Sequence, residues 1–75
     1  MRVRVISPFP IRGLGADGML ELHDGARVRD LLKHSVPAAL YTVLVPVSVN
    51  VRQVPPSHYL KDGDLVVILM PIGGG

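Results

Sequence analysis

The sequence predicts a small α+β domain in which one sheet carries one main helix. Three observations indicate this class. Two short segments near the N-terminus alternate polar and apolar residues with a period of two, which is typical of strands with one solvated face. A helical period follows, and then a further period-two segment and an unbroken apolar run. The predicted order is strand, strand, helix, strand, short strand, strand.

The first third of the chain predicts a β-hairpin. In residues 2–6 the two valines fall on one face, and in residues 19–23 the two leucines do, which leaves Glu21 and His23 facing outward. Residues 7–18 between these segments contain two prolines and three glycines, so they can form neither a helix nor an inner strand. We expect this segment to be a long first turn.

Residues 24–37 change to a helical period. One face collects residues at spacings i, i+3, i+4 and i+7, namely Val28, Leu31, Leu32 and Ser35. Asp24 is expected to cap the start of the helix, because Arg27, which also lies near the cap position, is a poor capping residue. Pro37 is expected to end the helix, since the residue before a proline is disfavoured in the helical region.

Residues 43–51 return to a period of two. Five valines are therefore expected on one face, namely Val43, Val45, Val47, Val49 and Val51. Pro46 lies on the opposite face and has no N–H to donate, which predicts a sheet edge or a bulge at that position. The chain is then expected to leave the sheet at residues 55–56, to turn tightly at residues 61–64 and to form its last strand over residues 65–71.

The last predicted strand is apolar along its length, a pattern typical of a strand that is buried on both faces. One helix covers only one face of a sheet. The other face is then covered either by the long first loop, residues 7–18, or by another protein. We favour a partner protein, because large exposed apolar patches on monomers usually mark binding sites.

The composition indicates one folded domain and limits its chemistry. The chain has 75 residues and no cysteine, so it can form neither a disulfide nor a thiolate zinc site, and 48% hydrophobic against 19% charged residues favours a packed core. The net charge of +2 is scattered, which predicts ordinary solvated charge and no nucleic-acid partner, with a surface for an anionic partner as the alternative. The sequence has no signal-peptide core and no apolar stretch of about 20 residues, so we expect a soluble cytoplasmic protein without a membrane partner.

The sequence contains no recognisable catalytic or metal-binding set. The three histidines occur at spacings that do not suit metal ligation, namely His23, His34 and His58. Asp62 and Asp64 flank Gly63, which suits a tight turn better than acid–base chemistry. With no cysteine nucleophile and no serine paired with a base, we do not expect the chain to be an enzyme or to hold a metal.

The C-terminus is the reactive feature of the sequence. Three consecutive glycines at a chosen terminus occur by chance about once in 3,000 at average glycine usage, although a cloning remnant or a plain flexible end stays open. Glycine passes through channels that exclude side chains, and residues 71–75 fully extended reach roughly 17 Å. The carboxylate of Gly75 is a poor electrophile, so a nucleotide-binding partner would have to convert it to an acyl-adenylate. A chain without cysteine would then carry transferable sulfur there, as a thiocarboxylate.

The chain resembles the MoaD/ThiS family of sulfur-carrier proteins over about residues 25–75. Residues 28–32, VRDLL, resemble the start of the family's helix, and Asn50 after an apolar strand resembles its turn. Residues 60–75 resemble its end, with L-x-x-GD-x-V, a strand, a proline, an apolar residue and a terminal diglycine. The resemblance implies a ubiquitin-like β-grasp fold, a mixed sheet of four to five strands with one main helix on one face, in a single domain 1–75 whose residues 72–75 form a flexible tail.

The resemblance also implies a function and its partners. Gly75 would be adenylated with ATP by a ubiquitin-activating-type adenylyltransferase (MoeB/ThiF-like) and thiocarboxylated with sulfur from a cysteine desulfurase or rhodanese-type donor. The acceptor would be an enzyme such as the molybdopterin synthase large subunit or thiazole synthase, and no bound cofactor is implied. The tail that enters a partner's active site would consist of Pro71, Ile72, Gly73, Gly74 and Gly75.

The residues before the terminal diglycine favour the molybdopterin-synthase small-subunit branch, whose ends often read proline, apolar, small, then two glycines. Two positions depart from the family pattern. Val51 follows Asn50 where a glycine is common, and valine disfavours a positive φ, so a different turn is expected there. Met70 stands where that branch often has proline.

Two other functions share these features. A ubiquitin-like modifier would use the same adenylate with a lysine amine as the nucleophile. A β-grasp RNA-associated module of the TGS kind shares the VRDLL, asparagine and GD-x-V features, but it needs no terminal diglycine. This chain also has few aromatic residues for base stacking and no focused basic face.

Overall fold

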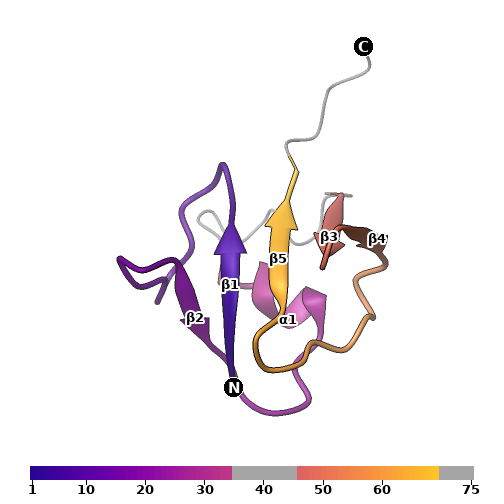
Figure 1. Ribbon diagram of the computed structural model, residues 1–75, viewed down its shortest axis with the longest axis horizontal. Helices are drawn as coiled ribbons and strands as arrows, with labels where there is room; N and C mark the ends of the chain where they lie inside the picture. The colour runs from indigo at the N-terminus through magenta and orange to yellow at the C-terminus, as the bar shows by residue number, and fades with distance from the viewer. Residues whose placement is uncertain (35–45, 70–75) are drawn as a thin grey trace.

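In the computed structural model of the protein, residues 1–34 and 46–69 are described, and they form one five-stranded sheet with one helix (Figure 1). The elements in chain order are β1 (Arg2–Ile6), β2 (Met19–Glu21), α1 (Val28–Leu32), β3 (Val47–Val49), β4 (Arg52–Val54) and β5 (Leu65–Ile68). The strands are arranged β2-β1-β5-β3-β4, with β1 and β5 parallel and the other neighbours antiparallel. The predicted α+β class and order of elements are confirmed.

The hairpin of β1 and β2 forms as the alternation predicts. Val3 lies opposite Leu20 in the antiparallel register, and both side chains are buried, whereas Glu21 is exposed. The middle of the loop that joins the strands packs on the helix side of the sheet. Ile11 is part of the buried core, and the backbone N–H of Arg12 donates to the carbonyl beyond the helix end, at His34, across 2.7 Å.

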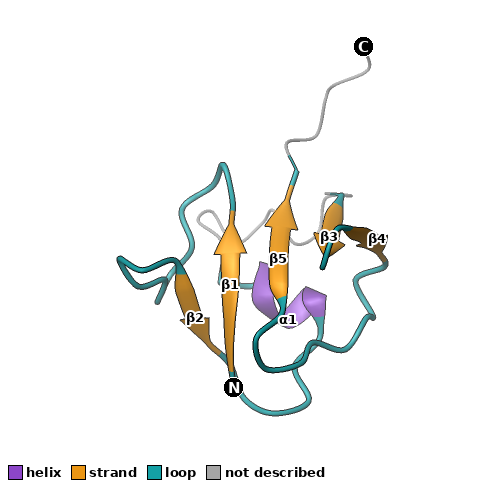
Figure 2. Ribbon diagram, in the orientation of Figure 1, coloured by secondary structure: helices purple, strands orange, loops and turns teal. Residues whose placement is uncertain are grey.

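Helix α1 packs against one face of the sheet (Figure 2). Val28, Leu31 and Leu32 are buried as their spacing predicts, because they share the face that meets the strands. The described helix ends at Leu32, so the expected roles of Ser35 and Pro37 lie outside the described residues. In the two described ranges, no helix is both long enough and apolar enough to span a bilayer.

The predicted cap of this helix is wrong. The Asp24 side chain is 97% exposed and lies 3.6 Å from the N-terminal amine of Met1. The capping position is occupied by Arg27, whose backbone N–H donates to the Asp30 carboxylate across 2.8 Å. The Arg27 guanidinium lies over the Tyr59 ring, 4.3 Å from its centroid, and donates to the Tyr59 hydroxyl.

The first N–H groups of the helix are satisfied by a distant segment. The N–H of Val28 donates to the carbonyl of His58, and the N–H of Arg29 donates to the carbonyl of Pro56, both across 2.9 Å. The first N–H groups of a helix have no partner within the helix. A side-chain cap is therefore not required here, and the same bonds fix the segment after β4 against the helix start.

The strand around Pro46 also differs from its prediction. β3 begins after Pro46 and lies between β5 and β4, so it is an inner strand, and β4 forms the edge. Pro46 needs no N–H because it precedes the ladder, and its carbonyl accepts a hydrogen bond from Leu69 across 2.9 Å. Val47 and Val49 are buried as expected, whereas Val43 and Val45 lie outside the described residues.

Val51 does not continue the buried face. β3 and β4 pair with Val49 opposite Arg52, so Asn50 and Val51 form a two-residue hairpin loop. Their φ angles are 52° and 63°, the left-handed values of a type I′ turn. The Val51 side chain is 91% exposed. The prediction of a different turn, which followed from the preference of valine for negative φ, is therefore wrong. The twist of the two strands requires the left-handed conformation.

β5 is buried on one face only, which corrects the predicted burial on both faces. Val66 and Ile68 are 0% and 3% exposed against the helix side, whereas Leu65 and Val67 are half-buried on the other side. Leu69, which follows the strand, is 45% exposed. The apolar residues of the second face therefore remain partly accessible.

Candidate functional site

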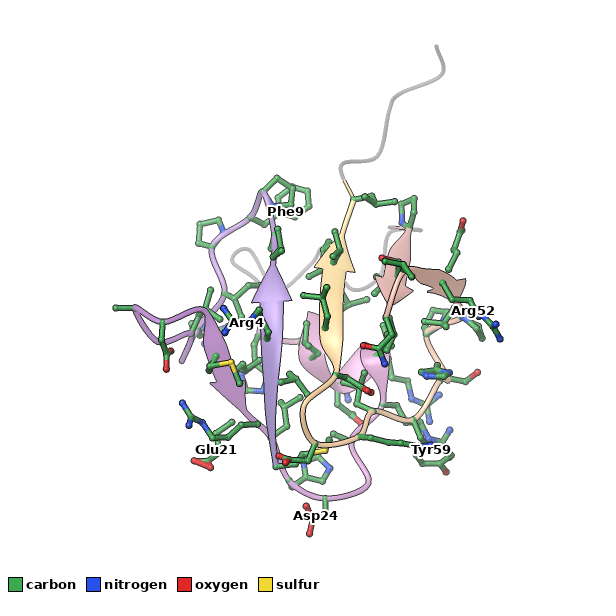
Figure 3. The ribbon with its side chains drawn as sticks, in the orientation of Figure 1. Arg4, Phe9, Glu21, Asp24, Arg52 and Tyr59 are labelled. Atoms are coloured by element: carbon green, nitrogen blue, oxygen red, sulfur yellow. The ribbon has the colours of Figure 1, made fainter. Side chains whose placement is uncertain are left out.

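The predicted reactive residues Pro71, Ile72, Gly73, Gly74 and Gly75 lie outside the described residues. The structure describes the strand that precedes this segment, β5, and the residue after it, Leu69. β5 lies in the middle of the sheet, with β1 on one side and β3 on the other. Because β1 and β5 are parallel neighbours, their C-terminal ends lie at the same end of the sheet. Figure 3 shows Phe9 at this same end of the molecule.

An apolar surface lies on the open face of the sheet at this end. Ile6 pairs with Val67 in the parallel register, and Leu69 follows two residues later on the same face. Ile6 is 55% exposed, Leu69 is 45% exposed and Val67 is half-buried. We call these three residues the tail-side surface. An adjacent apolar group of this kind is suited to contact another protein.

The opposite end of β5 is held by a hydrogen-bonded pair of side chains. The Asn50 amide nitrogen donates to the Asp64 carboxylate across 2.9 Å, and the Asn50 side-chain oxygen accepts from the N–H of Leu65, also across 2.9 Å. The second Asp64 oxygen accepts from the N–H of Lys61 across 2.8 Å. Asp64 is 8% exposed, so these bonds satisfy a carboxylate that would otherwise be buried without partners.

The turn before β5 is structural, as predicted. Gly63 has a φ of 85°, a conformation that disfavours other residues, and its N–H donates to the carbonyl of Arg2 across 2.8 Å. The Asp62 carboxylate accepts from the N–H of Arg2 across 2.7 Å. The Asp62 side chain therefore fixes this turn beside β1, whereas the Asp64 side chain joins it to the β3–β4 turn.

Two other carboxyl groups have shifted pKa values for local reasons. The N–H of Met19, which donates across 3.0 Å, holds the pKa of Asp17 below its ordinary value, and the Arg2 guanidinium acts in the same direction. The N–H of Arg27 likewise lowers the pKa of Asp30. Each group stabilises a turn or a helix start. Among residues 1–34 and 46–69, no cluster of three or more metal-ligating side chains occurs.

The sequence matches the ThiS family over residues 10–75. This chain belongs to the ThiS family. The family consists of β-grasp sulfur carriers, which act as carriers rather than as catalysts. No match was found among curated proteins.

A solved structure shows the same fold. The crystal structure of SAMP1 from Haloferax volcanii has a TM-score of 0.66 over 100% of both chains, at 16% sequence identity. At this identity the likeness shows the fold alone, which is the ubiquitin-like β-grasp. In this ThiS-family chain, the last described residue, Leu69, follows a central strand of the β-grasp sheet.

Sequence reasoning missed the contact between Asn50 and Asp64, although it singled out both residues. They are 14 positions apart, and the sequence pattern predicts two independent turns at these positions. The available signal was that each polar residue borders an apolar strand of the same sheet. In this ThiS-family protein the two turns meet, because β3 and β5 are antiparallel neighbours.

Proposed function

We propose that the protein is a sulfur carrier whose C-terminal Gly75 is adenylated and then thiocarboxylated, and which donates this sulfur in cofactor biosynthesis. The observation that carries the proposal is the combination of the fold and the C-terminal sequence. The last described residue, Leu69, follows a central strand whose far end is held by Asp64. The following residues 70–75 end in three glycines and can reach roughly 20 Å when extended.

The chemistry requires activation by a partner enzyme. A Gly75 carboxylate oxygen attacks the α-phosphorus of ATP, and pyrophosphate leaves, which produces a carboxyl-adenylate. A hydrosulfide ion then attacks the carbonyl carbon, AMP leaves and the terminus becomes a thiocarboxylate. When a sulfur donor supplies a persulfide instead, a thiol must reduce the resulting acyl disulfide to release the thiocarboxylate. The chain itself supplies the acyl group and a side-chain-free approach to it.

The tail-side surface supports the existence of a docking partner. Ile6 and Leu69 are both more than two-fifths exposed, and Val67 lies between them on the open face. In the first loop, Ile11 is buried in the core on the helix side, and Phe9 and Leu14 pack partly against that core. We propose that an adenylyltransferase of the ubiquitin-activating type covers the tail-side surface while it holds the tail in its nucleotide site.

We place the acceptor in molybdopterin-type biosynthesis in preference to thiamine biosynthesis. The support is the sequence that precedes the terminal diglycine, with Pro71 and Ile72 followed by the small residue Gly73. The acceptor would be a molybdopterin-synthase large subunit, into which the tail inserts. A reconstituted synthase reaction with the thiocarboxylated chain distinguishes this acceptor from a thiazole synthase.

The test is a mass measurement on the intact chain. Incubation with an activating enzyme, ATP and sulfide should raise the mass by about 16 Da, because one oxygen is replaced by sulfur. Deletion of Gly75 should abolish the increase without loss of the fold. A chain extended by one alanine is the matched control for tail length, and it should also stay unmodified. Equal modification of the shortened chain would exclude the proposed site.

A ubiquitin-like modifier is the second candidate, and the β-grasp fold with a glycine terminus suits it equally. In that case a lysine amine displaces AMP and forms an isopeptide bond. Incubation of tagged protein with cell extract and ATP would then produce ladders of conjugates that disappear when Gly75 is deleted.

A further inference from the structure

A hollow of about 340 Å³ lies near the start of β5, between the β3–β4 hairpin and the segment that leads to β5. Its apolar lining includes Val49 and Val54. Its polar lining includes three side chains that can carry positive charge, namely Arg52, His58 and Lys61. None of these three side chains has a role in the sulfur-carrier chemistry proposed above.

The fold explains why these side chains meet. Val49 and Arg52 are paired across the hairpin, so their side chains lie on the same face of the sheet. β4 is the edge strand of the sheet, so no further strand of the described residues lies beyond Arg52 (Figure 3). The opposite wall is held by the helix start, because the His58 carbonyl accepts the N–H of Val28 across 2.9 Å. The hollow is therefore built on two fixed elements.

The charge of the hollow is positive. Arg52 and Lys61 are cations, and in the described part of the chain neither side chain makes an ion pair or a side-chain hydrogen bond. The acidic residue of the lining, Asp64, already accepts hydrogen bonds from the Asn50 amide and from the Lys61 N–H. The lining of the hollow thus carries two cations and one carboxylate, and both oxygens of that carboxylate already accept hydrogen bonds. This arrangement favours the binding of an additional anionic group.

Val51, next to Arg52 in the sequence, exposes an apolar side chain from a strained backbone conformation. Val51 follows Asn50 of the hollow and precedes Arg52. Its φ of 63° is unfavourable for a β-branched residue, and its side chain is 91% exposed. Such strain persists only where the surrounding structure imposes it, and it is found at functional positions. A glycine would form the same turn without strain, but it would offer no apolar contact.

We propose that this end of the sheet is a second docking site, which binds an acidic segment of a partner protein. Carboxylates of the segment bind Arg52 and Lys61, with His58 as a further donor, and an apolar side chain of the segment packs on Val51. A protein segment explains the exposed valine, whereas a free phosphate would contact only the basic groups. The site lies near the start of β5, whereas the tail-side surface lies at its end, so the two docking sites do not overlap.

The test is a titration of the isotopically labelled full chain with a defined probe. The probe is an acetylated and amidated peptide, Glu-Glu-Val-Glu-Glu, and its control has glutamine in place of every glutamate. We expect saturable amide shifts at Val51, Arg52, His58 and Lys61 with the first peptide and none with the second. The chain that lacks Gly75 should bind the peptide equally well, which separates this site from the sulfur-carrier function.

Variants distinguish binding at this site from a general attraction of the acidic peptide to a positively charged protein. The double variant Arg52→Gln/Lys61→Gln should bind the peptide about tenfold more weakly, whereas Arg12→Gln/Arg29→Gln, which removes the same charge elsewhere, should bind it as the parent does. Val51→Gly should weaken binding although it relieves the strained turn. Absence of saturable shifts, equal weakening by both double variants, or no effect of Val51→Gly would overturn the proposal. So would equally tight binding of inorganic phosphate at the same residues.

Discussion

The side chain of Asn50 donates a hydrogen bond to the Asp64 carboxylate across 2.9 Å and thereby joins the β3–β4 turn to the start of β5. Its oxygen also accepts the N–H of Leu65, so one amide connects two turns that are separate in the sequence. This arrangement fixes the beginning of the strand whose other end continues into the C-terminal tail. The asparagine and the GD sequence of the family pattern therefore act together.

Asn50→Ala should lower the free energy of unfolding by about 1–3 kcal/mol, because it removes two side-chain hydrogen bonds and leaves part of the buried Asp64 carboxylate unsatisfied. Urea denaturation measures the change. Gln53→Ala, at an exposed position of the neighbouring strand, serves as the control and should change stability by less than about 0.5 kcal/mol. Equal effects of the two substitutions would show that the asparagine contact contributes nothing.

Val51→Gly should raise the free energy of unfolding by about 1 kcal/mol, since glycine adopts the left-handed conformation that valine disfavours. The side chain is 91% exposed, so little packing is lost. Thermal or urea denaturation measures the gain. Val51→Ala keeps a Cβ atom, so it should raise the free energy of unfolding by less than the glycine variant does. A destabilised glycine variant would contradict the left-handed turn.

Asp30→Ala should destabilise the protein by about 1 kcal/mol at neutral pH, because the carboxylate accepts the N–H of Arg27 at the helix start. The folded pKa of Asp30 lies below its ordinary value of 3.8, so the ionised form is favoured by folding. This contribution is fully present above 3.8 and is lost as the pH falls through the lowered pKa. Urea denaturation of parent and variant should therefore converge in strong acid, and a constant difference across the whole range would refute the ionic contribution.

Ile6→Asp should raise the KM of the chain as a substrate of its activating enzyme at least tenfold, with little change in kcat, because it places a charge in the tail-side surface. Steady-state release of pyrophosphate provides the measurement. His23→Asp places the same charge at an exposed position beside the start of β1, at the other end of the sheet, and it should leave this KM unchanged. Comparable defects in both variants would point to a general charge effect instead of a docking surface.

The sequence predicted the elements whose burial depends on local alternation. The leucines of β2 and the apolar residues of α1 are buried because the period of each segment selects one face. One local expectation failed because a distant segment decides the outcome. The carbonyls of Pro56 and His58 satisfy the helix start in place of Asp24, and no local pattern encodes that contact.

The prediction for Val51 was wrong for a different reason. Its alternation with Val47 and Val49 suggested a buried position, but the two-residue hairpin loop sets the chain direction there. Strand twist outweighs the conformational preference of one valine. The candidate site was predictable only as a short C-terminal sequence. The Asn50–Asp64 contact and the basic hollow needed the antiparallel register of β3 and β5, which sequence spacing does not reveal.

The most direct test of the sulfur-carrier account is the intact mass of the chain after incubation with an activating enzyme, ATP and sulfide. The account predicts a gain of about 16 Da that fragmentation assigns to Gly75 and that is absent when Gly75 is deleted. A chain that gains no sulfur under conditions in which the enzyme forms its adenylate, or that gains it at any other residue, would contradict the account.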